Sequence, residues 1–270
     1  MTGFSADWLA LREGADAAAR AESLTARLAA FCAARERVRI LDLGSGTGSN
    51  LRFLAPQLGG AQSWTLVDQD AALLDVAGLG EDLLEVEVKR QRVDLAGDWA
   101  SLTLSAADLV TASALMDLVS AAWFERLAAD CRAAGCALFF VLSYDGRMAW
   151  DPVDPLDEAV RDLFNQHQRG DKGFGPALGP EAPAEMRRIL EARGFRVETA
   201  ASDWDLGTEA TELQRALLEG FTAAAVETAP ERQAELEAWQ ARRREIISAG
   251  KSRLCVGHQD LFAAPEARPR

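Results

Sequence analysis

Residues 39–50, with the sequence RILDLGSGTGSN, constrain the fold of this chain more than any other feature. The apolar run at 40–43 is typical of a strand that is buried on both faces of a parallel sheet. Three glycines at alternate positions follow, and they let the backbone turn sharply and approach a ligand that a Cβ would repel. A second strand at 64–67 ends at Asp68, about 20 residues past the last glycine, where such folds place a ribose-binding acid. The pattern predicts an α/β fold that holds a nucleotide-like ligand at this turn.

The residues of the turn distinguish two kinds of ligand. A dinucleotide-binding turn needs G-x-G-x-x-G, but the third glycine position is Ser49 in this chain. Asp42 lies two residues before Gly44, and a carboxylate there would repel a pyrophosphate but would accept hydrogen bonds from an ammonium group. These residues favour S-adenosylmethionine as the ligand and disfavour an NAD-dependent reductase.

Over residues 36–145 the chain resembles the class I S-adenosylmethionine-dependent methyltransferases, with a weaker continuation to the C-terminus. Besides the glycine turn and Asp68, the resemblance rests on QRVDL at 91–95 and on ADLVTASALMD at 107–117. It implies that Asp42 and the loop 44–48 face the methionine part of the cofactor and that Asp68 binds the ribose. It also implies that Asp94 and Leu95 bind the adenine, although Asp94 as a helix N-cap is an alternative. The cofactor-binding residues expected in this way are Asp42, Gly44, Ser45, Gly46, Gly48, Asn50, Asp68, Gln69, Asp94, Leu95, Ser113 and Arg20.

The implied fold is α/β, with a Rossmann-like, seven-stranded, mostly parallel sheet and helices on both faces. Residues 1–35 show helical periodicity and are expected to form an N-terminal cap, in which Arg12 or Arg20 is a candidate to pair with the cofactor carboxylate. A solvated arginine is the alternative at each position. The methyltransferase domain is expected at 36–262, with its last two strands near 195–199 and 253–256, and a flexible tail at 263–270.

A first insertion is expected at about 144–183, where a helical stretch leads into a loop rich in glycine and proline. Such a loop follows the carboxyl end of a strand, where α/β folds place their ligands. The acceptor-binding residues predicted there are Asn165, Arg169, Lys172 and Phe174. The predicted catalytic residues are His167, as a base whose reference pKa is near neutrality, Tyr144 and Asp117. The alternatives are a structural role for His167 and a helix cap or a solvated acid for Asp117.

A second insertion at 208–250 separates the last two strands. It carries one apolar helix stripe through Leu213, Leu217 and Phe221 and a second through Leu236 and Trp239. We expect a helical hairpin that serves as a lid, as a homodimer surface or as extra packing on the core. The three arginines at 242–244 are expected to form a solvated helix face.

Composition and short motifs disfavour nucleic acid, a membrane span and a metal ion as partners of this chain. A net charge of −13 argues against a nucleic-acid substrate, because phosphate binding requires clustered Lys and Arg. Residues 113–116, SALM, also differ from the Asn/Asp-Pro-Pro-aromatic sequence of family members that methylate base amines. Without an 18-residue apolar run or a signal-peptide pattern, no membrane span is expected and the cytoplasm is the default location. Four cysteines without C-x-x-C spacing and two histidines predict no metal site.

The function predicted from the sequence is methyl transfer from S-adenosylmethionine to a small-molecule acceptor. Such a transfer is an in-line displacement, so the protein mainly aligns the acceptor with the methyl group and excludes water. The identity of the acceptor and the methylated atom, oxygen, nitrogen or sulfur, stay open. The alternative is a catalytically silent S-adenosylmethionine-binding protein with a regulatory or assembly role, and the intact cofactor motifs favour the enzyme.

Overall fold

The computed structural model describes residues 4–79, 85–97 and 102–266. The strands are β1 (Arg37–Leu43), β2 (Ala61–Asp68), β3 (Val86–Arg92), β4 (Leu109–Ser113), β5 (Ala137–Asp151), β6 (Phe195–Ala201), β7 (Trp204–Leu206) and β8 (Arg253–Pro265). Within the described ranges they form one eight-stranded sheet in the order β3-β2-β1-β4-β5-β8-β6, with β7 paired to β8. Strands β1 to β5 are parallel, whereas β8 runs antiparallel to β5, β6 and β7.

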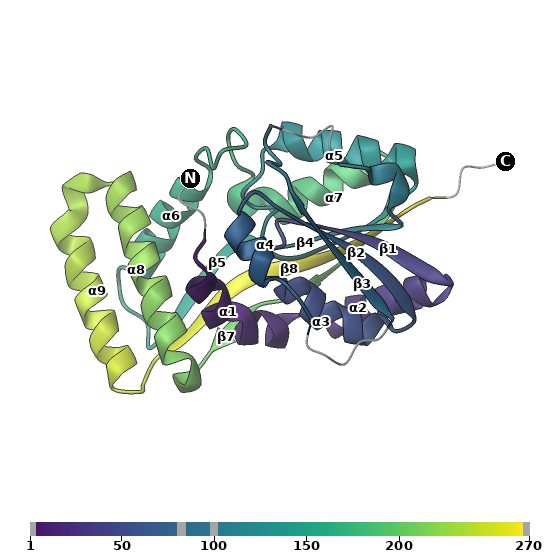
Figure 1. Ribbon diagram of the computed structural model, residues 1–270. Helices are drawn as coiled ribbons and strands as arrows, with labels where there is room; N and C mark the ends of the chain where they lie inside the picture. The colour runs from purple at the N-terminus through teal and green to yellow at the C-terminus, as the bar shows by residue number, and fades with distance from the viewer. Residues whose placement is uncertain (1–3, 80–84, 98–101, 267–270) are drawn as a thin grey trace.

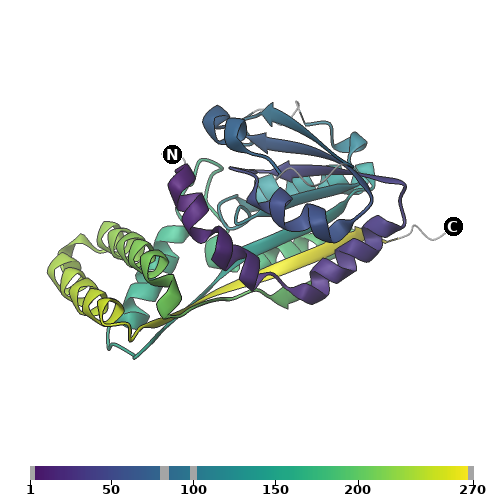
Figure 2. The same ribbon diagram turned by 60° about the horizontal axis from the view of Figure 1, so that its bottom comes forward.

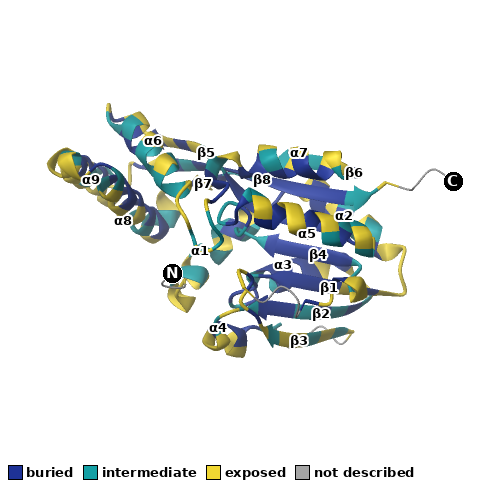
Figure 3. Ribbon diagram, turned by 90° about the horizontal axis from the view of Figure 1, so that it is seen from above, coloured by how far each residue is buried: buried dark blue, intermediate teal, exposed yellow. Residues whose placement is uncertain are grey.

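Helices cover both faces of this sheet (Figure 1). They are α1 (Ala6–Ala19), α2 (Glu22–Ala33), α3 (Ser49–Leu58), α4 (Ala71–Val76), α5 (Ala121–Ala134), α6 (Asp157–Gln168), α7 (Ala182–Ala192), α8 (Thr211–Thr228) and α9 (Gln233–Ser248). The central strands β1 and β4 are largely buried, while the edge strand β3 is largely exposed (Figure 3). Parallel strands need crossover helices on both faces, which explains why the second half of β1 and most of β4 are buried.

Two consecutive phenylalanines on β5 show how the strand serves two cores. Phe140 packs on one face with Phe124 of α5, at 5.8 Å between ring centroids. Phe139 belongs to the other face, in one cluster with Leu28 of α2 and Leu54 of α3. Successive side chains of a strand point to opposite faces of the sheet. One phenylalanine is therefore buried under each of the two helical layers. The Rossmann-like fold class is confirmed, and β7 is a short addition to the seven predicted strands.

Strands β5 and β8 are longer than the sequence pattern predicts. The strand β5 continues through Tyr144 to Asp151, where the first insertion was expected to begin, and pairs with the first residues of β8. The register shifts near Leu142 and Gly146, which have φ values of 55° and 87°. These bulges interrupt the alternation that marks a strand in sequence, and the partner strand is distant along the chain. At its other end β8 runs to Pro265 and pairs with β6, so the expected tail at 263–270 begins too early. Residues 267–270 lie outside the described residues.

The long ribbon of β5 and β8 carries the predicted helical hairpin, α8 and α9, away from the main sheet (Figures 1 and 2). The apolar stripe of α8, with Leu217 and Phe221, packs into a third core with Trp150 of β5 and Trp239 of α9. Phe221 also meets Phe164 of α6 at 4.8 Å between ring centroids. The stripe is therefore buried within the chain. No helix in the described part of the chain has the length and apolarity to cross a membrane.

Arg243 corrects the expectation of a solvated face at 242–244. Its side chain is 0% exposed, and Nε donates to Asp157 Oδ1 at 3.1 Å. A second guanidinium nitrogen contacts the other carboxylate oxygen of Asp157, and a third donates to Pro152 O at 2.5 Å. The indole of Trp239 also donates to Asp157 Oδ1, at 2.9 Å. Arg244, in contrast, has a side chain that is 53% exposed. A buried ion pair therefore joins α6 to α9.

Candidate functional site

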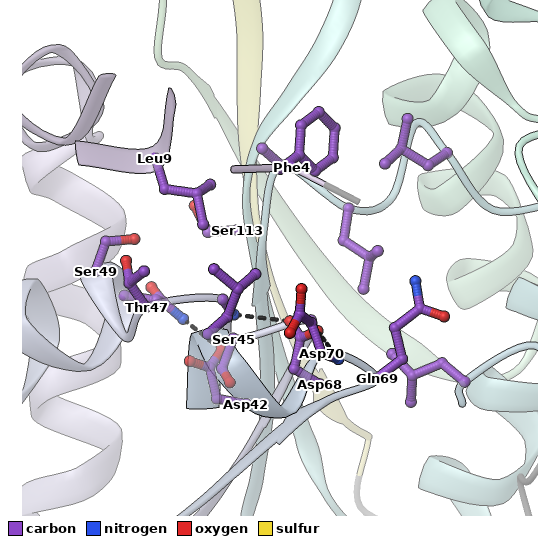
Figure 4. Close-up of a pocket in the computed structure, with 18 of the residues that line it drawn as sticks. Phe4, Leu9, Asp42, Ser45, Thr47, Ser49, Asp68, Gln69, Asp70 and Ser113 are labelled. Carbon is purple, nitrogen blue, oxygen red and sulfur yellow. Dashed lines mark hydrogen bonds between the residues drawn. The ribbon is translucent and has the colours of Figure 1, made fainter. Parts of the chain in front are cut away.

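A cavity of about 320 Å³ lies at the carboxyl ends of β1, β2 and β4, under helix α1. The glycine turn and Asp68 form one wall, and Leu9 and Phe4 of the N-terminal segment also line the cavity (Figure 4). Leu9 packs against the turn at Gly46. The remaining wall comes from the segment after β4 and from residues 173–174. The cavity therefore combines the predicted turn with a helical cover.

Most of the predicted cofactor-binding residues line this cavity. Those that do are Asp42, Gly44, Ser45, Gly46, Asn50, Asp68, Gln69, Asp94, Leu95 and Ser113. Gly48 and Arg20 are not in the lining. Gly48 instead caps α3 with a φ of 85°, and a Cβ there would lie 3.3 Å from the backbone nitrogen of Gly78. Its conformation serves the turn rather than a ligand.

The first two glycines have left-handed backbone conformations and close neighbours. The φ values are 62° at Gly44 and 52° at Gly46. A Cβ on Gly44 would lie 3.2 Å from the side chain of Leu115, and a Cβ on Gly46 would lie 2.9 Å from Leu9 of α1. An L side chain is strained at such angles, so this loop requires glycine for both its φ angles and its packing.

We expect Gly46→Ala to lower stability by about 1–2 kcal/mol and also to weaken the binding of S-adenosylhomocysteine. The added methyl group would force either the loop or Leu9 out of place. Gly135→Ala is the matched control, since Gly135 has a φ of 77° but nothing within 4 Å of the added Cβ, and it lies at the end of α5. Thermal unfolding and calorimetry should show a similar stability loss in both variants and weaker binding only in Gly46→Ala. Unchanged binding by Gly46→Ala would contradict this role of the loop.

Asp42 presents an unused carboxylate oxygen at the cavity. The residue is 0% exposed, and Oδ1 accepts a hydrogen bond from Asn50 Nδ2 at 2.8 Å. Oδ2 is buried and has no hydrogen-bond partner. Burial raises the pKa of this carboxyl to about 7, against the opposing effects of Asn50 and Arg20. A buried acceptor without a partner is costly, and a ligand donor at this position would satisfy it.

Asp68 organises the other end of the cavity. Its Oδ2 accepts from Gly46 N and its Oδ1 from Asp70 N, each at 2.9 Å. Each carboxylate oxygen can accept a further bond from a ligand. The backbone carbonyl of Asp68 accepts from Val93 N at 2.9 Å, which brings the end of β3 beside the end of β2. Asp94, which follows, accepts from Ala96 N at 2.9 Å, and residues 95–97 form a turn.

Helix α1 contributes Arg12, a candidate named from the sequence, together with Asp16 and Leu9, which were not predicted. The Arg12 side chain is 12% exposed and is therefore not a solvated arginine. Arg12 and Asp16 form a two-pronged ion pair, at 2.9 and 3.1 Å, and both line the cavity. The Arg12 guanidinium also lies 4.9 Å from the ring centroid of Trp204, whose indole donates to Asp16 at 3.1 Å. Leu9 completes this face, and its spacing from Arg12 and Asp16 places the three on one side of a helix. That spacing was the available signal in the sequence.

The predicted catalytic residues lie outside the cavity lining. Tyr144 donates to Asn165 Oδ1 at 2.8 Å, and burial raises the pKa of its hydroxyl. It is turned toward α6 because β5 continues through this position. His167 Nε2 lies 3.0 Å from Glu227 of α8. Asp117 has a buried Oδ1 without a partner, and burial raises the pKa of this carboxyl to about 6.

Of the predicted acceptor-binding residues, only Phe174 lines the cavity. Asn165 is held between Tyr144 and the carbonyl of Gly146, which accepts from its amide at 3.0 Å. Arg169 pairs with Glu181, and Lys172 Nζ lies 3.2 Å from Nδ1 of His167. The polar side chains in and after α6 contact neighbouring elements. Asn165, Arg169 and Lys172 therefore do not gather at the cavity as the sequence analysis expected. No cluster of three potential metal ligands is found among the described residues.

Comparisons with known proteins show which solved structures share this fold. No family model and no curated protein matches the sequence. Among solved structures, a cyclopropane synthase, MmaA2, from Mycobacterium tuberculosis is similar with a TM-score of 0.52 and 10% identity, over 97% of this chain and 94% of that chain. An S-adenosylmethionine-dependent methyltransferase from Geobacter sulfurreducens, in complex with S-adenosylhomocysteine, has a TM-score of 0.47 and 18% identity over 100% of both chains. A phosphoethanolamine N-methyltransferase from Haemonchus contortus has a TM-score of 0.45 and 15% identity, over 92% of this chain and 53% of that chain. With its strand order and its glycine turn, this chain has the fold of the class I S-adenosylmethionine-dependent methyltransferases.

Proposed function

We propose that this protein is an S-adenosylmethionine-dependent methyltransferase that acts on a small-molecule acceptor. The observation that carries the proposal is the placement of Asp42 and Asp68 at the two ends of the glycine loop, in one cavity. Asp42 offers its unpartnered Oδ2 to the ammonium group of the cofactor. Asp68 offers acceptor positions to the ribose hydroxyls, beside Asp94 and Leu95 for the adenine.

The cofactor, when bound, supplies an electrophilic methyl group on a sulfonium. The remaining lining belongs to the acceptor side and is mostly apolar, with Leu9, Leu115, Leu118 and Phe174 around the Arg12–Asp16 ion pair. These side chains would exclude water and align the acceptor with the methyl group. Among the described residues that line the cavity there is no His, Lys, Tyr or Cys. This composition supports an acceptor that needs no strong general base from the protein.

A direct test is calorimetry with S-adenosylmethionine, S-adenosylhomocysteine and NADH, followed by an assay for S-adenosylhomocysteine production with a panel of small nucleophiles. We expect both sulfur ligands to bind and NADH not to bind. Turnover with one acceptor class would establish the enzyme, whereas tight binding without any turnover would favour the catalytically silent alternative.

The affinity for S-adenosylhomocysteine should depend on pH through Asp42. The carboxyl has a pKa of about 7, so below this pH it is mainly protonated in the free protein and must lose its proton to pair with the ligand ammonium. We expect the affinity to rise about tenfold between pH 6 and pH 7.5 and then to level off. Asp42→Asn should bind more weakly and without this pH dependence. An equally steep pH profile in Asp42→Asn would show that another group titrates.

A further inference from the structure

Arg20 lies at the joint between α1 and α2, close to the cavity but behind its wall. The residue is 6% exposed. One guanidinium nitrogen donates to Asn50 Oδ1 at 2.9 Å and another to Ser113 Oγ at 3.3 Å. The guanidinium also lies 4.9 Å from the ring centroid of Phe53. These contacts fix the side chain between α3 and the end of β4.

Asn50 connects Arg20 to Asp42. Its amide oxygen accepts from Arg20, while its Nδ2 donates to Asp42 Oδ1 at 2.8 Å and to Thr111 Oγ1 at 3.1 Å. The hydroxyl of Thr111 in turn donates to Phe139 O at 2.7 Å, which leaves its oxygen free to accept from Asn50. Both ends of the Asn50 amide are used, so its orientation is determined. A continuous chain of hydrogen bonds therefore runs from Arg20 to the carboxylate at the cavity.

The joint itself is anchored by a third carboxylate. Asp260 of β8 is 0% exposed, and its Oδ2 accepts from Ala21 N at 2.9 Å. Its Oδ1 accepts from Leu142 N at 2.8 Å. Since Ala21 follows Arg20 directly, this contact holds the Arg20 backbone against β5 and β8.

The charges around this network act in opposite directions on Asp42. Burial and the carboxylate of Asp68 raise the pKa of Asp42, whereas Asn50 and the charge of Arg20 lower it. Arg20 in turn faces Asp260, Asp16 and Asp42, with Arg12 as the nearby like charge. Arginine keeps its charge in proteins, so Arg20 is a fixed cation beside two fully buried carboxylates.

The same contacts argue against direct binding of the cofactor carboxylate by Arg20. Two guanidinium nitrogens are engaged with Asn50 and Ser113, and Nε is buried without a partner. Arg20 is also absent from the lining of the cavity, whereas Asn50 and Ser113 are part of it. Its influence on a ligand is therefore indirect, through its hydrogen bonds to these two residues and through its charge near Asp42.

We propose that Arg20 is a positioning residue for the cofactor: through Asn50 it holds the Asp42 carboxylate in place at the cavity, without touching the cofactor. The proposal rests on the proposed function, because it assigns Asp42 to the ligand ammonium. The alternative role for Arg20 is a direct ion pair with the ligand carboxylate. The affinities of three ligands distinguish these two roles.

The experiment is calorimetry over pH 5.5–8 with S-adenosylhomocysteine, its decarboxylated analogue, which retains the ammonium group, and 5′-methylthioadenosine, which lacks both groups. In Arg20→Met, we expect the pH midpoint of S-adenosylhomocysteine binding to rise by about one unit. The decarboxylated analogue should lose affinity by a similar factor, and 5′-methylthioadenosine should bind as it does to the wild type. Arg20→Lys, which keeps the charge, should retain most of the wild-type midpoint. The control is Arg27→Met, because Arg27 of α2 forms a partly exposed ion pair with Glu198 of β6, away from the cavity lining. This variant should change neither the pH midpoint nor the affinity for the decarboxylated analogue.

Loss of affinity for S-adenosylhomocysteine alone, with the decarboxylated analogue unaffected, would overturn the proposal in favour of a direct ion pair. An unchanged pH midpoint in Arg20→Met would overturn it in favour of a merely structural role. If Arg20→Met does not fold, Arg20→Gln, which also removes the charge, is compared for the first two ligands and decides in the same way. Failure of the wild type to bind any of the three ligands would instead remove the proposed function and this proposal with it.

Discussion

Arg243→Ala is expected to lower the free energy of unfolding by about 3–5 kcal/mol, because it leaves the buried carboxylate of Asp157 without its counter-charge. The arginine makes two hydrogen bonds to Asp157 and one to Pro152 O, and all three are lost in the variant. Trp239 also depends on the same carboxylate. The loss should therefore loosen the packing of α9 on α6. Denaturant unfolding, with tryptophan fluorescence as the probe, measures the effect.

Arg244→Ala is the matched control, one residue away on the same helix. Its nearest acid, Glu219, is 3.8 Å away, and both side chains are more than half exposed. We expect a change within about 0.5 kcal/mol, as for other exposed ion pairs. The double variant Arg243→Met with Asp157→Leu should be more stable than either single variant, because no charge then stays buried alone. Equal stability of Arg243→Ala and Arg244→Ala would show that the ion pair does not stabilise the hairpin.

Asp68→Ala is expected to weaken the binding of S-adenosylhomocysteine by about 1–3 kcal/mol, or roughly fivefold to 150-fold. The substitution removes the acceptors proposed for the ribose and also the anchor of Gly46 N. Because 5′-methylthioadenosine retains the ribose, its affinity should fall by a similar factor. This separates the role of Asp68 from that of Arg20, whose variants should leave this ligand unaffected.

Asp75→Ala, which removes an exposed carboxylate from the neighbouring helix α4, is the control and should bind normally. Asp68→Asn should give an intermediate affinity, because an amide oxygen can still accept one of the bonds. Calorimetry on correctly folded variants provides the measurement. Undetectable binding of both S-adenosylmethionine and S-adenosylhomocysteine by the wild type, or tighter binding of NADH, would remove the methyltransferase proposal.

The sequence by itself determined which residues gather at the glycine turn. Asp42 and Asp68 lie at the carboxyl ends of β1 and β2, and the glycine turn follows β1 directly. Neighbouring parallel strands bring these ends to one edge of the sheet. Asp94 comes to the same edge because β3 pairs with β2. Local patterns and the topology of parallel sheets were enough here, since every residue is placed by the strand that precedes it.

Only the tertiary structure decided which residues line the rest of the cavity and what the helical hairpin packs against. Tyr144 points away from the cavity because β5 continues along β8, a partner more than a hundred residues later, across bulges that hide the alternation. Arg243 is buried because it pairs with Asp157 of α6. The two residues are 86 positions apart in sequence, so no local pattern indicates the pairing. The lining formed by Leu9, Arg12 and Asp16 depends on how α1 docks over the glycine loop. Helical periodicity shows which residues share a face of a helix but not which segment covers that face. The covering segment is set by contacts between residues that are distant in sequence.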